Sequence, residues 1–378
     1  MRIVLAIDSF KGSMTSMEAA SAAKEGILSV CPHAEVIPVP IADGGEGTVE
    51  ALVSGMGGEV RTVTVHGPLL DPVSAPYGFL PESNTAIIEM AAASGLVLVP
   101  KEKRNPTLTT TYGVGELIRH AIESGARHFI IGIGGSATHD CGVGMLQALG
   151  WRFSYKDGIC SLSEVEFIDK SGVLPALSEC TFRIACDVTN PLCGETGAAS
   201  VYSPQKGADE AMVKALDGAS LRFAELYTKT GAAASPFPCG ALHTHPGAGA
   251  AGGLGFAFLG FLGGELCSGI RLIMEETGLE EKIIGSDLVI TGEGRIDAQT
   301  SMGKAPAGVA ELGKKHGVPV FMVAGGCKNV SAVNGFPCFS VLRGPMTLDE
   351  AMKAENAKNN MRETAAAITA AALCLGKE

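Results

Sequence analysis

The sequence predicts an α/β protein of two domains, and three observations carry this prediction. The chain has 378 residues, more than one domain usually contains. Strand-like apolar runs alternate with helical patterns at both ends, as in parallel α/β layers. Between the ends, short strand patterns follow one another without a separating helix, which favours antiparallel pairing. We therefore expect a Rossmann-like parallel α/β domain formed from both termini, residues 1–60 plus 285–378, and an inserted mixed α/β domain, residues 61–284. A sequential two-domain arrangement is the alternative.

The first domain segment alternates strand and helix. The apolar run Arg2–Ile7 predicts a buried strand. Thr15 and Glu18 have the spacing of a capping box, which predicts the start of a helix. Glu35–Pro40 predicts a second strand, and a helix after it should end near Met56. This order is typical of two parallel strands joined by a helix.

The central segment begins with the antiparallel pattern and then returns to alternating strands and helices. The expected elements are three short strands, a helix, a further strand with a helical pattern to Gly150, and an apolar run: Glu59–Val65, Val73–Leu80, Ala86–Met90, Thr109–Ser124, Phe129–Ile133 and Thr181–Cys186. The uncharged stretch Ala248–Gly264 is marginal in length for a membrane span and rich in glycine, so we expect a buried turn leading into a core helix. Its first part, Gly247–Gly255, is the most flexible-looking in the chain and could form a hinge or lid.

The last hundred residues return to α/β alternation. Strands are expected at Asp287–Thr291, Val318–Val323 and Phe339–Leu342, and a helix at Ala305–His316. A capping box at Thr347 and Glu350 predicts one final helix. Its apolar positions recur at helical spacing and should face the core: Leu348, Met352, Met361, Ala365, Ile368, Ala372 and Leu375.

Composition and charge exclude several classes of function. The net charge of −11 disfavours nucleic acid and anionic membrane surfaces as partners, because the general field repels phosphate. The 11 cysteines include no CxxC pair, which argues against a disulfide framework or a zinc site. The apolar run at the N-terminus is too short for a signal peptide. We expect a cytoplasmic protein, and a homodimer is compatible with these features.

The stretch Phe129–Gly144, FIIGIGGSATHDCGVG, is the most informative motif. A strand enters a turn made of Gly132, Gly134 and Gly135, and the hydroxyl residues Ser136 and Thr138 follow. Such a turn leaves backbone N–H groups unpaired at the start of a helix, which favours an anion. A tight structural turn is the competing interpretation, so this motif alone leaves phosphate binding open.

Three further strand ends carry similar turns: DSFKG at Asp8–Gly12, DGGEG at Asp43–Gly47 and TGEGRID at Thr291–Asp297. In parallel α/β sheets, ligands bind beyond the carboxyl ends of the strands. Glycines, cations and carboxylates together suit phosphoryl transfer, because N–H groups and cations hold phosphates while carboxylates hold Mg²⁺ or accept a proton. Lys11 and Arg295 are the candidate cations. Their structural alternatives are a solvated lysine and a local ion-pair cluster.

The common nucleotide and nucleophile motifs are absent. Gly303-Lys304 is followed by Ala305, so a Walker A hydroxyl is missing. The sequence has neither the protein-kinase motifs nor a GxGxxG turn after its first strands, and no GxSxG elbow is found. His243 and His245 are too few ligands for zinc.

With these turns in place, the sequence resembles the type 1 glycerate kinase family. The matching segments are AIDSFKGSMTS near the start, ADGGEGT, GIGGSATHDCGVGMLQALG, ACDVTNPLCG, GAGAAGGLGFA and SDLVITGEGRIDAQTSMGKAP. They occur in order from near residue 1 to about residue 330. Cys141 stands where we would expect glycine. A small residue is tolerated at such a position if its φ is negative.

The resemblance implies an ATP- and Mg²⁺-dependent kinase of D-glycerate that gives 2-phosphoglycerate, and it favours the discontinuous two-domain architecture. We hypothesise that Gly132, Gly134, Gly135, Ser136 and Thr138 cradle the ATP phosphates. Lys11 and Arg295 would hold the glycerate carboxylate or neutralise the transferring charge. Asp187, which ends a strand, is the first candidate for the base. Asp297, Asp43 and Asp8 are candidates for holding Mg²⁺, or for the base if Asp187 is structural.

Other functions stay open at this point. The turns do not distinguish glycerate from other small hydroxy acids, nor phosphorylation at the 2-hydroxyl from the 3-hydroxyl. A non-catalytic sensor of a phosphorylated metabolite is disfavoured by the acids that recur on the glycine turns. An NAD-dependent dehydrogenase is disfavoured by the missing fingerprint.

Overall fold

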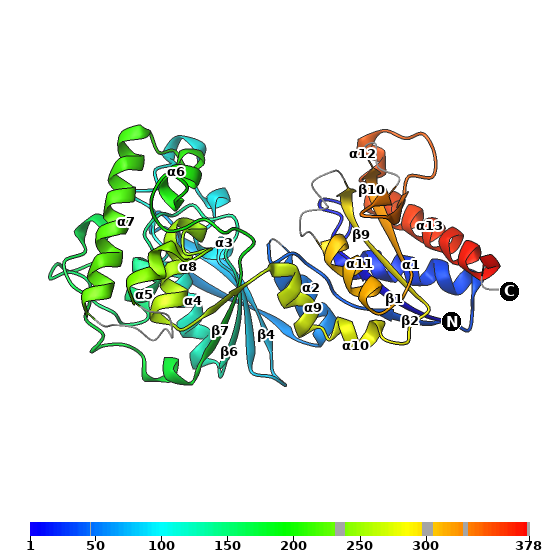
Figure 1. The fold of residues 1–378 in the computed structure, drawn as a ribbon, viewed down its shortest axis with the longest axis horizontal. Helices are drawn as coiled ribbons and strands as arrows, with labels where there is room; N and C mark the ends of the chain where they lie inside the picture. The colour runs from blue at the N-terminus through cyan, green and yellow to red at the C-terminus, as the bar shows by residue number, and fades with distance from the viewer. Residues whose placement is uncertain (46, 231–238, 297–304, 328–331, 376–378) are drawn as a thin grey trace. The chain divides into compact units, whose positions relative to one another are not determined.

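The computed structural model describes residues 1–45, 47–230, 239–296, 305–327 and 332–375 (Figure 1). It divides into two compact units. The terminal unit comprises Met1–Asp43, Glu50–Gly57 and Ile270–Glu378, and the central unit comprises Gly44–Val49 and Gly58–Gly269. One sheet therefore comes from both termini and the other from the inserted central region, as the predicted fold class requires. The boundaries expected from the sequence, 60/61 and 284/285, stay a prediction.

The terminal unit is built on a six-stranded sheet in the order β11-β12-β10-β9-β1-β2. The strands are β1 (Arg2–Ile7), β2 (Glu35–Pro38), β9 (Leu288–Ile296), β10 (Val320–Cys327), β11 (Ala332–Val333) and β12 (Phe336–Ser340). All neighbours pair in parallel except β11 with β12. The carboxyl ends of β1, β9 and β10 therefore meet at one edge of the sheet, where ligands of parallel sheets bind.

The central unit has a second six-stranded sheet in the order β3-β4-β5-β6-β7-β8. Its strands are β3 (Glu59–His66), β4 (Pro72–Leu80), β5 (Thr85–Glu89), β6 (His128–Gly132), β7 (Thr181–Ala185) and β8 (Glu265–Cys267). β3, β4 and β5 pair antiparallel, and the β3–β4 pair confirms the pairing predicted from the helix-free connection between the first two strands. β5 to β8 are parallel, so the turns after β6 and β7 lie at the same edge.

Helices follow the strands in both units. The α-helices are α1 (Ser16–Val30), α2 (Thr48–Met56), α3 (Ala91–Ser94), α4 (Tyr112–Glu123), α5 (Val143–Ala148), α6 (Ala198–Tyr202), α7 (Glu210–Thr230), α8 (Ala250–Phe261), α9 (Gly269–Glu276), α10 (Leu279–Ile283), α11 (Ala305–Lys315), α12 (Leu348–Ala351) and α13 (Ala354–Leu375). Short 3-10 helices are η1 (Leu96–Leu98), η2 (Lys101–Lys103), η3 (Leu162–Glu164), η4 (Pro175–Glu179), η5 (Pro204–Lys206) and η6 (Cys239–Thr244).

The core of the terminal unit joins its sheet to α1 and α13, which lie side by side (Figure 1). Ile3, Leu5 and Ile7 belong to that core, while Val4 and Ala6 are equally buried. Because successive side chains of a strand point to opposite faces, β1 is covered on both sides. This double burial explains why its sequence is a continuous apolar run rather than an alternating one.

Both predicted capping boxes form, but the second starts a shorter helix than expected. Thr15 and Glu18 cap α1, and Thr347 and Glu350 cap α12. The chain then breaks after Ala351, and α13 begins at Ala354. The predicted core stripe was wrong at its first two positions, since Leu348 and Met352 are 73% and 40% exposed. Met361, Ala365 and Ile368 on α13 are buried as predicted.

The glycine-rich stretch near α8 is buried in the central unit. A Cβ on Gly252 would lie 2.1 Å from the Thr138 carbonyl oxygen, and one on Gly253 would lie 2.8 Å from the Cys141 Sγ. These glycines therefore let the stretch pack closely against the turn after β6. α8 is the buried helix expected after it, and no helix in the described part of the chain is long and apolar enough to span a membrane.

Cys141 does not meet the condition of a negative φ under which a small residue would be tolerated in place of glycine. Its φ is +53°, in the left-handed region that favours glycine. The side chain is fully buried, and its thiol donates to the Ser220 hydroxyl at 3.3 Å. Packing and this contact hold cysteine in a conformation that costs about 1 kcal/mol relative to glycine.

Candidate active site

A cavity of about 930 Å³ in the terminal unit gathers four of the predicted site residues. Asp8 and Lys11 follow β1, Asp43 follows β2, and Arg295 lies near the end of β9. They come from segments far apart in the sequence, and parallel pairing of β2, β1 and β9 brings those segments to one edge. We call this cavity the terminal pocket.

Asp8 has the most perturbed environment in the terminal pocket. Burial raises the pKa of its carboxyl to about 7, and the negative charges of Asp43 and Glu293 act in the same direction. A hydrogen bond from the Ser9 backbone N–H, at 2.6 Å, and the charge of Lys11 oppose this rise. Such a perturbed carboxyl in a cavity, faced by other carboxylates and a cation, is a common feature of functional sites.

The carboxylates of the terminal pocket suit Mg²⁺ chemically, since oxygen ligands are the ones this ion prefers. Within the described ranges, however, no three His, Cys, Asp or Glu side chains are grouped to hold a metal ion. The predicted ligand Asp297 lies outside the described residues. The terminal pocket therefore suits an ion that binds one or two carboxylates and obtains its other ligands from phosphates and water.

The second group of predicted residues lies in the central unit, in the turn after β6. Gly132 is packed against the segment after β2, because a Cβ there would lie 2.2 Å from the Gly44 carbonyl oxygen. Gly134 faces open space, and Gly135 has a φ of +73° that suits a tight turn. Of the three glycines, Gly134 has the free surroundings that a bound phosphate needs.

The hydroxyl residues of this turn lie deeper than Gly134 and Gly135, which are exposed. Ser136 is 8% exposed and Thr138 is fully buried. The Ser136 hydroxyl and the Thr138 carbonyl both accept hydrogen bonds from the Lys206 Nζ, each at 2.7 Å. The Thr138 Oγ1 is buried, and no residue in the described ranges is its hydrogen-bond partner. Ser136 is thus buried with slight exposure, and Thr138 is part of the interior of the turn.

His139 and Asp140, which end the motif, have structural roles. The His139 ring nitrogens contact the hydroxyls of Ser203 and Ser220 at 3.1 and 3.0 Å. Burial, with the nearby Lys206 charge, lowers the pKa of His139 to about 3, so the ring is neutral. The Asp140 carboxylate accepts from the Thr111 N–H and hydroxyl at 2.8 Å, and from the N–H groups of Gly142 and Gly144.

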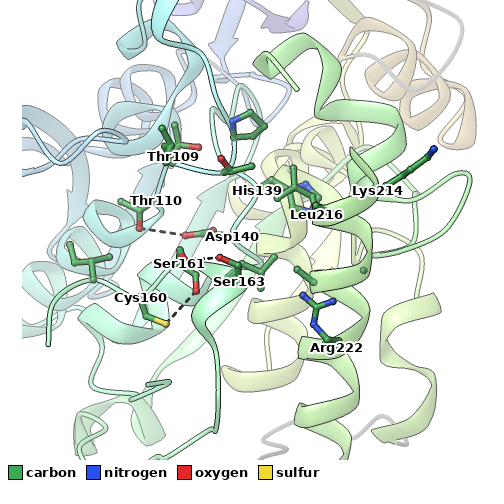
Figure 2. Close-up of a pocket in the computed structure, with 18 of the residues that line it drawn as sticks. Thr109, Thr110, His139, Asp140, Cys160, Ser161, Ser163, Lys214, Leu216 and Arg222 are labelled. Atoms are coloured by element: carbon green, nitrogen blue, oxygen red, sulfur yellow. Dashed lines mark hydrogen bonds between the residues drawn. The ribbon is translucent and has the colours of Figure 1, made fainter. Parts of the chain in front are cut away.

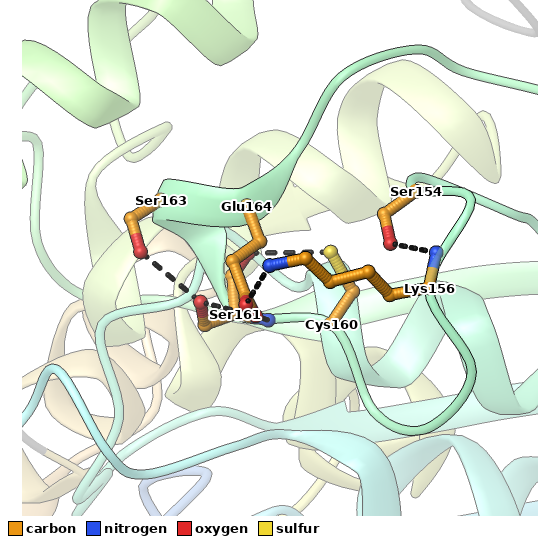
Figure 3. Close-up of polar contacts among 6 residues, drawn as sticks. All are labelled: Ser154, Lys156, Cys160, Ser161, Ser163 and Glu164. Carbon is orange, nitrogen blue, oxygen red and sulfur yellow. Dashed lines mark hydrogen bonds and ion pairs between the residues drawn. The ribbon is translucent and has the colours of Figure 1, made fainter.

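Behind His139 and Asp140 lies a separate cavity of about 550 Å³ (Figure 2). Thr109 and Thr110 line it with them, and Lys214 and Arg222 of α7 lie on the opposite side (Figure 2). One wall is the loop that contains η3. Figure 3 shows how Ser161 and Glu164 close a capping box there while the Lys156 Nζ pairs with Glu164 at 2.9 Å. This cavity contains none of the residues predicted to be catalytic.

Asp187 follows β7, the strand beside β6. It is exposed, and its Oδ1 accepts a hydrogen bond from the Gly269 N–H at 3.0 Å. Since β6 and β7 are parallel neighbours, Asp187 and the glycine turn share one edge of the central sheet. The predicted residues thus form two groups, one in each unit: Asp8, Lys11, Asp43 and Arg295; and Gly132, Gly134, Gly135, Ser136, Thr138 and Asp187.

Sequence reasoning missed Lys206 and gave Glu293 no role of its own. Lys206 lies in SPQKG, a polar segment that is typical of an exposed turn, and no signal in it points to burial. Glu293 belongs to the TGEGRID turn and could have been chosen with Arg295, its near neighbour in that turn. It lines the terminal pocket.

Comparison with known proteins places the chain in a family. The model of the glycerate kinase family matches residues 3–373. Glycerate 2-kinase of Escherichia coli K12 is 48% identical over 367 residues, 93% of each chain, and glycerate kinase of Bacillus subtilis 168 is 45% identical over 98% of this chain and 97% of its own. A solved structure described as glycerate kinase 2, from Salmonella typhimurium LT2, is 43% identical with a TM-score of 0.89, covering 100% of this chain and 99% of that one. The chain belongs to the glycerate kinase family and is a phosphotransferase of that family.

Proposed function

We propose that the protein transfers the γ-phosphoryl group of ATP to the 2-hydroxyl of D-glycerate and forms 2-phosphoglycerate. The observation that carries this proposal is the terminal pocket, where two cations and three carboxylates from three strand ends line one cavity. The name of the E. coli relative, glycerate 2-kinase, supports the choice of hydroxyl. Kinases of other small hydroxy acids, and 3-phosphorylation of glycerate, are the alternatives.

In this proposal Lys11 and Arg295 hold the glycerate carboxylate or neutralise the charge of the transferring group. A guanidinium binds a carboxylate through two parallel hydrogen bonds, and an ammonium adds a compact charge. The turn of Gly132, Gly134, Gly135, Ser136 and Thr138 holds the ATP phosphates through backbone N–H groups and the Ser136 hydroxyl. The open space at Gly134 supports this role.

Asp187 is the proposed base. It accepts the proton of the glycerate hydroxyl while that oxygen forms a bond to the γ-phosphorus and the bond from phosphorus to the bridging oxygen of ADP breaks. Its exposure at the end of β7 leaves it accessible to a substrate. Asp8 and Asp43, with Asp297 as a third candidate, would hold Mg²⁺, which when bound neutralises charge on the phosphates. We infer a cytoplasmic enzyme, and a homodimer stays a prediction.

The test is ADP formation from ATP and Mg²⁺ with and without D-glycerate, with the product isomer identified by ³¹P NMR. We expect glycerate-dependent turnover and the 2-phosphate. The 3-phosphate would contradict the regiochemistry. Turnover with lactate, tartronate or hydroxypyruvate, but none with D-glycerate, would contradict the substrate while retaining the kinase. No ADP with any acceptor would contradict the whole proposal.

A further inference from the structure

Lys206 is a buried lysine that lies directly behind the glycine-rich turn. It is 2% exposed, and its Nζ donates to two acceptors of the turn, the Ser136 hydroxyl and the Thr138 carbonyl. The segment that carries it is held firmly in place. The Ser203 hydroxyl contacts the buried His139 ring, and a Cβ on Gly207 would lie 2.1 Å from the Arg104 carbonyl oxygen.

The hydrogen bonds of Lys206 match a neutral amine. An amine has two N–H groups and an ammonium has three. The described residues supply two acceptors and no carboxylate within ion-pair distance of Nζ. The charge of Asp140 acts on Lys206, but five groups already donate to that carboxylate at 2.8 to 3.5 Å. Burial lowers the pKa of Lys206 to about 7, against the smaller effect of Asp140.

A second observation points to a ligand at this turn. The Thr138 Oγ1 is fully buried and has no hydrogen-bond partner among the described residues, which is uncommon for a buried hydroxyl. It belongs to the same residue whose carbonyl receives the Lys206 hydrogen bond. Among the described residues, the turn therefore has a buried hydroxyl without a hydrogen-bond partner and a buried amine without an ion-pair partner. An anion would supply the counter-charge.

We propose that Lys206 is the positioning residue of the glycine-rich turn, fixing Ser136 and Thr138 from within the protein and taking up a proton when a nucleotide phosphate binds there. The phosphate then supplies the negative charge that the buried ammonium lacks. The inference rests on the proposed function in one respect, that this turn is where ATP phosphates bind.

The other ionisable groups around Lys206 are His139, Asp140 and Arg104, the last on the segment packed against Gly207. Burial lowers the pKa of His139 to about 3, so its ring is neutral near pH 7, while burial raises the pKa of Asp140. The proposal assigns proton uptake between pH 7 and pH 9 to Lys206, and the Lys206 variants below test that assignment.

The first measurement is calorimetry of MgADP binding at pH 8, in buffers with different ionisation enthalpies. A group with a pKa near 7 is about 90% deprotonated at pH 8, so we expect uptake of most of one proton. At pH 6 the uptake should be close to zero, because Lys206 is already protonated. This measurement uses the unmodified protein, so it needs no variant to fold. The absence of uptake at pH 8 would overturn the proposal.

The second measurement uses variants. Lys206→Met should weaken MgADP binding about 30-fold or more and abolish the uptake, while the KM for glycerate changes less than about threefold. Lys206→Arg keeps a charge that does not titrate, so it should restore most of the affinity without proton uptake. Lys214→Met, at an exposed lysine of α7, is the matched control and should change neither. Affinity within threefold of normal in Lys206→Met would overturn the proposal.

These outcomes are distinct from those of the proposed function. A protein that binds MgADP with Lys206-dependent proton uptake, yet does not phosphorylate glycerate, would retain this inference and lose the substrate. A protein that phosphorylates glycerate with normal turnover but takes up no proton on binding MgADP would retain the proposed function and contradict this inference.

Discussion

At the scale of single residues, the sharpest test concerns Asp187. If it accepts the hydroxyl proton, Asp187→Asn should lower kcat by about 10² to 10⁴, the usual contribution of a general base. KM should change little, because the amide keeps the size and the acceptor for Gly269. Asp157→Asn, at an exposed acid of the same unit, is the control. Nearly full turnover in a folded Asp187→Asn protein would remove Asp187 from the chemistry.

Lys11 gives a second prediction at this scale. A charge-assisted hydrogen bond contributes about 1.5–3 kcal/mol, so Lys11→Ala should lower kcat/KM for glycerate about 10- to 100-fold. Stability should hardly change, because Lys11 is exposed. Lys353→Ala, also exposed in the terminal unit, should leave the kinetics unchanged. An unchanged kcat/KM in the Lys11 variant would exclude this lysine from the site.

The buried ring of His139 should make the stability of the central unit depend on pH. Its folded pKa of about 3 lies below the ordinary value of 6.5, so the unfolded chain binds more protons between those values. The stabilisation is thus fully present above pH 6.5 and is lost as pH falls toward 3, by several kcal/mol in all. Urea unfolding of His139→Gln should show lower stability at pH 7.5 and a flatter profile from pH 6.5 to 4. His33→Gln, at an exposed ring, should keep the normal slope.

At the scale of elements, the contact between α1 and α13 depends on one glycine. A Cβ on Gly26 would lie 2.0 Å from the Arg362 carbonyl oxygen, and backbone cannot yield as a side chain can. We expect Gly26→Ala to destabilise the terminal unit by about 1–3 kcal/mol, despite the better helix propensity of alanine. Gly218→Ala in α7 is the control, since its Cβ would meet one side-chain atom at an ordinary 3.5 Å. That substitution should stabilise the helix, and equal melting temperatures of the two variants would refute the packing argument.

The sequence predicted elements well where local chemistry decides them. The capping box of Thr15 and Glu18 fixes the start of α1 by hydrogen bonds within one turn. The start of this helix can therefore be predicted from the local sequence alone. Prediction from the sequence failed where packing decides the structure. The periodic pattern through Leu348 and Met352 suggested a core stripe, yet the helix breaks after Ala351 and both side chains line the terminal pocket.

In the candidate site too, the residues set by local sequence were predicted and the residue set by distant packing was not. Asp8, Lys11, Asp43 and Arg295 were chosen because they end predicted strands, and parallel strand order brings them to one cavity. Lys206 follows no strand, and its burial depends on η5 packing against the turn after β6, a contact across about seventy residues of sequence. Non-local burial of this kind leaves no periodic trace in the sequence.

At the scale of the whole molecule, the proposed roles divide between the two units. The cations and Mg²⁺ ligands belong to the terminal unit, and the phosphate turn and base belong to the central unit. In-line transfer requires the glycerate hydroxyl and the γ-phosphorus to be about 3–3.5 Å apart. If every assignment holds, one pair of bound substrates must contact both units in the reactive state.

We therefore predict that bound substrates bring the units together, which would also exclude water and limit wasteful ATP hydrolysis. X-ray scattering with a non-hydrolysable ATP analogue, Mg²⁺ and D-glycerate together should show a smaller radius of gyration than the free protein. Either ligand alone should give a smaller change, because each contacts mainly one unit. Lys11→Ala with both ligands is the control and should compact less, since its glycerate contact is weakened. Scattering curves that do not change with both ligands bound would mean that the units do not close, and at least one group of assigned residues would then lie outside the reactive site.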